Sequence, residues 1–224
     1  MIIYSPLNFL IEEITNREIP QADSIIELLH PSKDRARSIF ISQLNIALKE
    51  FCKHYPLTMT KNVTSTPYTF IDNSEGYMLG NIDFRNLELV PQSIANVKQT
   101  LLGKSVTRNN FIYDIKTHTL NNATGLVTYF TNYPVYYELD ENNGFTDESG
   151  VYLLDPKSSE GNMFIDQLAY CLLMSINNSR NTIAPQFGMQ FFDFGQRLGE
   201  LLQTINLNNS YSSTIYNIWS NTGI

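Results

Sequence analysis

The sequence has few cysteines and histidines and no long apolar run. It therefore lacks the usual sequence features of disulfide-rich secreted proteins, zinc-binding proteins and membrane proteins. Only two of its 224 residues are cysteine and three are histidine, too few for a disulfide framework. No apolar run approaches the roughly 18 residues of a membrane span, so we expect no membrane contact. Residues 1–6 show neither a basic start nor a small-residue cleavage site, so we expect no signal peptide. Without export, Cys52 and Cys171 are expected to be buried thiols rather than a disulfide.

Positive charge is scarce in the second half of the chain. Residues 1–112 carry 11 Lys and Arg against 11 Asp and Glu, whereas residues 113–224 carry 4 against 11, which accounts for the net charge of −7. A free-standing nucleic-acid-binding protein presents a basic face that releases counterions. No such face can be assembled from this sequence, so we expect no tight nucleic-acid binding.

The hydrophobic pattern changes twice along the chain. Hydrophobic residues make up 42% of the sequence, enough for a globular core. Apolar residues recur every three or four positions in residues 1–56 and 156–224, whereas residues 57–155 are rich in Thr, Val, Tyr and Ile between turn clusters. We therefore expect one α+β domain over residues 1–224. A helical bundle would be built from both chain ends, with an inserted antiparallel β-sandwich or barrel-like unit.

The helical parts contain several distinct stripes. We expect a first helix from Ser5, a short apolar segment at Ile25–Leu29, and a long helix from Ser32 to about Tyr55. In the second helical part we expect one helix from Glu160. The apolar residues that define these stripes are Leu7, Leu10, Ile11 and Ile14; Ala36, Phe40, Leu44, Ala47, Phe51 and Tyr55; and Phe164, Leu168, Cys171, Leu172 and Ile176.

Two further helices are expected near the end of the sequence. One carries Phe191, Phe194, Leu198, Leu201 and Ile205, and a last short helix carries Tyr211, Ile215 and Trp219. Gly195 and Gly199 fall in the first of these two, where each glycine costs about 1 kcal/mol relative to alanine. Close helix packing, within the chain or between subunits, would compensate that cost.

Two hairpins are expected in the β part. Residues 111–120 alternate as a strand does, and a turn separates them from residues 126–130. A second hairpin would pair residues 135–139 with 151–154 across an acidic loop. Residues 94–102 fit a strand or a short helix equally well.

No residue pattern indicates an active site. His30, His54 and His118 lack the spacing of a zinc site, and Gly-x-Ser-x-Gly is absent. The tripeptide Gly103-Lys104-Ser105 lacks the upstream glycine of a phosphate-binding loop and is expected to be a turn. Carboxylate pairs are unavoidable among 22 acids, so they identify no glycosidase site. We expect no enzyme activity, no catalytic residue, no cofactor and no bound metal.

The acidic loop of residues 138–149 is the one candidate contact site. It does not fit an EF-hand, because counting from Asp140 places Gly144 fifth and Val151 twelfth; calcium binding of another kind stays an alternative. Its Asn142-Asn143-Gly144 turn and five acids indicate a projecting hairpin tip. Such a tip would be merely solvated, would face a channel, or would meet Lys or Arg of a neighbouring subunit through Asp140, Glu141, Asp147 and Glu148.

Taken in order, four stretches carry a family resemblance: residues 42–51, 111–114, 125–130 and 164–172. Their order and spacing, with the Asn-rich and Tyr-rich composition, resemble head-to-tail connector ring proteins of tailed bacteriophages. These include the adaptor, neck and tail-tubular or gatekeeper proteins and ring proteins of crAss-like phages.

The resemblance implies a non-enzymatic structural subunit that forms a homo-oligomeric ring around the DNA channel. It would contact the portal or adjacent connector and tail proteins, in the virion neck or tail and, before assembly, in the infected host's cytoplasm. Two alternatives stay open: a carbohydrate-binding or glycan-degrading phage tail component, and a cytoplasmic bacterial interaction protein.

Overall fold

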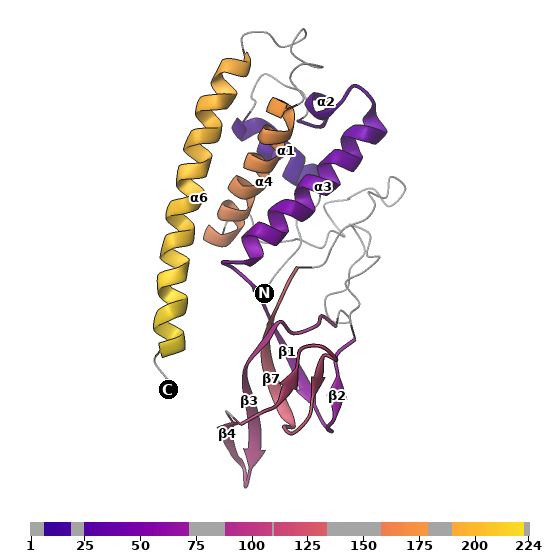
Figure 1. Ribbon diagram of the computed structural model, residues 1–224, viewed down its shortest axis with the longest axis vertical. Coiled ribbons are helices and arrows are strands. Elements are labelled where there is room, and N and C mark those ends of the chain that lie inside the picture. The colour runs from indigo at the N-terminus through magenta and orange to yellow at the C-terminus, as the bar shows by residue number, and fades with distance from the viewer. Residues whose placement is uncertain are drawn as a thin grey trace. The chain divides into compact units, whose positions relative to one another are not determined.

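The fold is α+β, with antiparallel sheets, as the sequence predicts (Figure 1). The computed structural model describes residues 7–18, 25–71, 88–108, 110–133, 158–178 and 190–221. These residues belong to two units, a helical unit that contains all the described helices and a β unit that contains all the described strands.

The helical unit is centred on one helix from the second half of the chain. Its elements are α1 (Leu7–Glu18), α2 (Ile25–Leu29), α3 (Lys33–Cys52), α4 (Ser159–Asn178) and α6 (Gln190–Asn221). Helix α4 contacts each of the other four. The predicted stripe residues that lie within α3 and α4 are buried, because apolar residues three and four apart lie on one helix face; Tyr55, the last residue of the first stripe, is half-buried.

Aromatic rings join α3 to α4. The rings of Phe51 and Phe164 meet edge to face at 5.6 Å between centroids, and Tyr55 stacks on Phe51 at 4.8 Å. Tyr55 lies three residues past the end of α3, which is shorter than predicted, and its hydroxyl donates to the carbonyl of Asn208 in α6 at 3.1 Å. The two cysteines lie in this packed region as buried thiols.

Helix α6 is one continuous helix of 32 residues, not the two helices that the sequence predicts (Figure 1). The apolar pattern weakens at residues 206–210, but this stretch contains neither proline nor glycine, so nothing in it stops a helix. The Ser210 hydroxyl donates to the carbonyl of Leu207 at 2.7 Å. A polar stretch therefore interrupts the stripe without interrupting the helix.

The two glycines of α6 have open space around them. A Cβ atom on Gly195 or Gly199 would meet no atom within 4 Å, so close helix packing within the described part of this chain does not explain them. We expect Gly199→Ala to stabilise the isolated protein by about 1 kcal/mol, because alanine restricts the unfolded chain and favours the helix. Urea unfolding followed by far-ultraviolet circular dichroism measures this, and a loss of stability in Gly199→Ala would contradict it.

The described strands of the β unit form two antiparallel sheets. The strands are β1 (Leu57–Val63), β2 (Tyr68–Thr69), β3 (Ser93–Leu101), β4 (Lys104–Arg108), β5 (Tyr113–Asp114), β6 (Thr119–Leu120) and β7 (Gly125–Thr131). One sheet has the order β1-β7-β3-β4 and the other β2-β6-β5. Neither closes on itself, so among the described strands the barrel alternative is wrong. Residues 94–101, which fitted strand or helix, lie in β3.

The predicted hairpin between residues 111–120 and 126–130 is also wrong. Residues 111–120 fold back on themselves, so that β5 pairs with β6, while β7 pairs with β1 and β3. The carboxylate of Asp114 makes this turn, accepting hydrogen bonds at 2.9 Å from the Lys116 amide and the Thr117 hydroxyl. His118 completes it with a φ of 53°. The second predicted hairpin, 135–139 with 151–154, lies outside the described residues.

Both sheets contribute to one hydrophobic core. Phe70 and Leu120 come from the smaller sheet and its flank, and they join buried side chains of the larger sheet, namely Val63, Val97, Val127 and Tyr129. The rings of Phe70 and Tyr129 meet edge to face at 5.2 Å. This cluster explains why the short strands β2, β5 and β6 hold their positions.

Candidate functional site

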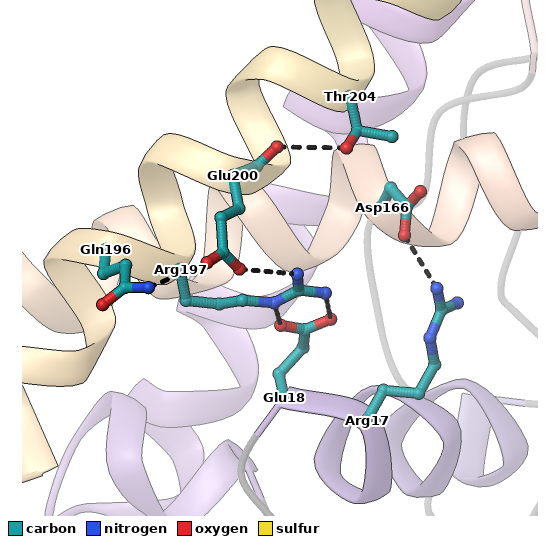
Figure 2. A network of polar contacts seen from close by, with 7 residues as sticks. All are labelled: Arg17, Glu18, Asp166, Gln196, Arg197, Glu200 and Thr204. Carbon is teal, nitrogen blue, oxygen red and sulfur yellow. Dashed lines mark hydrogen bonds and ion pairs between the residues drawn. The ribbon is translucent and has the colours of Figure 1, made fainter.

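The acidic contact loop predicted from the sequence, with Asp140, Glu141, Asp147 and Glu148, lies outside the described residues. The site described here is a polar network between helices instead (Figure 2). It involves three helices of the helical unit, α1, α4 and α6.

A bidentate ion pair forms the centre of the network. Glu18 is the last residue of α1, and Arg197 lies in the first third of α6. The Nε and Nη2 atoms of Arg197 donate to the two carboxylate oxygens of Glu18 at 2.6 and 2.9 Å. The side chain of Glu18 is only 1% exposed and that of Arg197 is 38% exposed. A planar guanidinium matches both carboxylate oxygens at once, which fixes the end of α1 against α6 in orientation as well as distance.

Neighbouring residues of α6 hold the arginine in place. Glu200 accepts from Arg197 at 3.3 Å and from the Gln196 amide at 3.0 Å. These residues lie three and four positions apart, where side chains of one helix face meet. Thr204 donates its hydroxyl to the backbone carbonyl of Glu200 at 3.1 Å. These contacts within α6 therefore orient the Arg197 side chain towards Glu18.

A second ion pair joins α1 to α4. The Nη2 atom of Arg17 donates to Oδ1 of Asp166 at 2.8 Å. Burial raises the pKa of Asp166 above its ordinary value, opposed by the charge of Arg17, and the nearby Glu18 raises it further. The pKa of Arg197 is raised by its hydrogen bonds to Glu18, against the effect of its burial. Arginine stays charged throughout the accessible pH range, so Arg197 has no lone pair with which to act as a general base.

The raised pKa of Asp166 makes a pH-dependent prediction. Folded Asp166 holds its proton to a higher pH than the unfolded chain does, so its contribution to the free energy of unfolding falls as pH rises above 3.8, the ordinary value. Asp166→Asn cannot ionise and should keep the Arg17 contact through its amide oxygen.

We expect Asp166→Asn to unfold near the wild-type temperature at pH 3. It should become the more stable of the two as pH rises through the raised pKa towards 7. Paired thermal unfolding curves at several pH values measure the difference. An Asp166→Asn protein that loses stability relative to wild type towards pH 7 would contradict the prediction.

A smaller polar cluster lies in the β unit. The hydroxyl of Tyr68 donates to Glu88, and Nζ of Lys61 lies 3.5 Å from the second carboxylate oxygen of Glu88. Burial and then the Glu88 contact raise the pKa of Tyr68. The phenol is therefore protonated and Lys61 charged at neutral pH, so this cluster is a set of satisfied contacts rather than an acid–base pair.

The histidines occupy turns and a helix end. Nδ1 of His30 accepts from the Ser32 amide at 3.0 Å, between α2 and α3. His118 lies in the β5–β6 turn, where its Nδ1 is 3.4 Å from the Tyr113 hydroxyl, and His54 follows α3. In the described ranges, no three His, Cys, Asp or Glu side chains gather closely enough to hold a metal ion.

Sequence reasoning missed the network completely. Glu18 and Arg197 are 179 positions apart, and no local pattern marks either of them. The one local signal is the spacing of Gln196, Arg197 and Glu200 on one helix face, which is common on solvated helices.

Comparisons with protein-family models, with curated proteins and with solved structures found no match to this chain. In the part of the chain that is described, no helix is both long enough and apolar enough to cross a membrane.

Proposed function

We propose that this protein is a non-enzymatic structural subunit of the head-to-tail connector of a tailed bacteriophage. In this proposal it forms a homo-oligomeric ring around the DNA channel, in contact with the portal or adjacent connector and tail proteins. The fold would be a helical bundle from both chain ends with an inserted β-sandwich. It would lie in the cytoplasm of the infected host before assembly and in the neck or tail of the virion afterwards.

The observation that carries the proposal is the way the polar side chains are used. Glu18, Arg197, Arg17 and Asp166 are paired with one another across helices from the two halves of the chain (Figure 2). An active site instead aims a nucleophile or a base with an unusual pKa at a space for substrate. Ion pairs that join distant helices suit a component whose task is to keep its shape.

The charge of the chain supports a passage for DNA rather than a binding site. A ring that guides DNA should not hold it, because each phosphate contact with Lys or Arg strengthens binding. A net charge of −7 meets that condition. Double-stranded DNA would pass through the ring without tight binding.

The carbohydrate-binding alternative requires several exposed aromatic rings beside a pair of carboxylates. Among the aromatic residues whose side-chain burial the structure describes, which leaves out those at 7–9, 190–194 and 212–221, Tyr211 is the one of the exposed class. No observation on these residues favours that alternative.

Electron microscopy of the purified full chain tests the proposal. We expect closed rings with an open centre, and the same protein at the neck or tail of virions. A protein that stays monomeric at every concentration and is absent from virions would contradict it. Neutralising Asp140, Glu141, Asp147 and Glu148 to Asn and Gln then tests the acidic loop: failed stacking on the next ring indicates a subunit contact, and altered DNA passage in intact rings indicates a channel surface.

A further inference from the structure

The β3–β4 hairpin is an exposed edge of the larger sheet. Strand β4 comes last in the order β1-β7-β3-β4, so among the described strands it is paired on one side only. All five of its residues are exposed. An edge strand has backbone N–H and C=O groups that are free to pair with a further strand, and proteins commonly protect such edges.

The tip of this hairpin carries a leucine where leucine is unfavourable. The two turn residues, Leu102 and Gly103, both have positive φ values, 51° and 75°. Turns of this kind favour Asn-Gly, because a branched side chain is strained in the left-handed region. The side chain of Leu102 is also fully exposed, at 104%. Within the described residues it gains no contact that offsets the strain.

The register places further apolar side chains on one face of the hairpin. Directly opposite residues of an antiparallel pair share a face. Val97 pairs with Arg108, Gln99 with Val106 and Leu101 with Lys104, and these pairs lie on the face that buries Val97 in the core. Beyond that core, Leu101 and Val106 are 52% and 39% exposed. The face of the larger sheet that is buried at Val97 is therefore exposed to solvent at the hairpin, where Leu101 and Val106 make it partly apolar.

The charge of the hairpin is opposite to that of the rest of the chain. Residues 93–108 contain Lys98, Lys104 and Arg108 and no acid, whereas the remaining residues carry 12 Lys and Arg against 22 Asp and Glu. Lys104 and Arg108 lie on the same face as the exposed apolar side chains. Apart from this hairpin, a second copy of the chain therefore has a net charge of the opposite sign, which favours its association with this surface.

We propose that the β3–β4 hairpin docks on a second copy of this chain, through Leu102 and the face with Leu101 and Val106. This inference rests on the proposed function in taking the partner to be another subunit of the same ring. A strand of the partner added at β4 would hydrogen-bond to the unpaired backbone N–H and C=O groups of β4, and carboxylates of the partner would form ion pairs with Lys104 and Arg108. DNA fits this surface less well, because two cations neutralise few phosphates and the exposed leucines would gain nothing from the backbone.

The test compares Leu102→Asn with wild type by sedimentation velocity over a range of concentrations. Asparagine suits the turn, so we expect the thermal midpoint to rise by about 4 °C, while self-association weakens at least about tenfold. A substitution that stabilises the subunit and weakens the assembly separates docking from misfolding. The matched control is Leu126→Thr on β7, another leucine exposed by 43%, which should leave self-association unchanged.

A second variant tests the charges. Wild-type self-association should weaken as salt rises, and Lys104→Gln combined with Arg108→Gln should weaken it at low salt and flatten the salt dependence. Unchanged self-association in Leu102→Asn would overturn the proposal. So would a charge variant that keeps wild-type self-association and instead loses duplex DNA binding.

The outcomes separate this inference from the proposed function. Rings that form regardless of Leu102 leave the connector proposal intact and overturn the docking site. A Leu102-dependent pair of subunits that never closes into a ring keeps the docking site and overturns the connector proposal. A monomer at every concentration overturns both.

Discussion

Replacing Arg197 with methionine is expected to lower the free energy of unfolding by about 3 kcal/mol. Methionine keeps much of the packing volume but removes both donors from the carboxylate of Glu18, whose side chain is 1% exposed. A buried charge without its partner is far more costly than the pair was favourable. The loss stays below that of a fully buried pair, because Arg197 is itself 38% exposed and water reaches its site.

Adding Glu18→Gln should restore most of this loss. The double variant no longer buries a charge, so it should be more stable than Arg197→Met alone, and urea unfolding of the four members of the cycle measures the coupling. Glu200→Gln is the control, since the side chain of Glu200 is 51% exposed and it should cost less than about 0.5 kcal/mol. Equal stability of Arg197→Met and Glu200→Gln would show that the pair contributes nothing to holding α1 against α6.

Gly125→Ala is expected to be at least as damaging in the β unit, with a loss of more than about 3 kcal/mol. Gly125 has a φ of +126°, and a Cβ atom there would lie 2.3 Å from the carbonyl oxygen of Lys98. That oxygen belongs to β3, which pairs with β7 at this point. Neither strand can yield without breaking its pairing.

Gly103→Ala is the matched control for that variant. Gly103 also has a positive φ, +75°, but a Cβ atom there would meet nothing within 4 Å. It should lose only the cost of the left-handed conformation, about 1 kcal/mol. Urea unfolding followed by near-ultraviolet circular dichroism, to which the packed rings of Phe70 and Tyr129 contribute, measures the difference. If the two alanine variants unfold together, the close approach of β3 to Gly125 does not limit stability.

The sequence predicts those helices that have a single continuous apolar face. The stripes of α3 and α4 are predicted because burial against neighbouring helices requires apolar residues every three or four positions. Prediction fails where a single side chain decides the path. Nothing in the alternation of residues 111–120 shows that Asp114 will bind two groups just ahead of it and turn the chain. Prediction fails in α6 for another reason. The apolar pattern weakens in the middle of this helix, but without a proline or glycine a weakened pattern does not end a helix.

Local sequence patterns cannot predict the ion pair at the centre of the candidate site. Glu18 ends α1 and Arg197 lies in α6, so their meeting depends on how the helices pack, which periodicity does not specify. The exposed Leu102 was equally invisible, because the sign of its φ is known only once the hairpin has formed. Both features arise from long-range geometry acting on residues that look ordinary in sequence.

The pairing of the first strand of the β unit with its last has an evolutionary consequence. Leu57 of β1 lies directly opposite Thr131 of β7, so the chain enters and leaves the larger sheet at neighbouring positions, about 5 Å apart. Whatever lies between those two residues can lengthen, shorten or change its sequence without moving the two ends that connect to the helices. We therefore expect the β unit to be exchangeable between chains that share the helical unit. Lineages that keep the same helices could acquire new surface specificity by replacing it with any module that ends in two adjacent antiparallel strands.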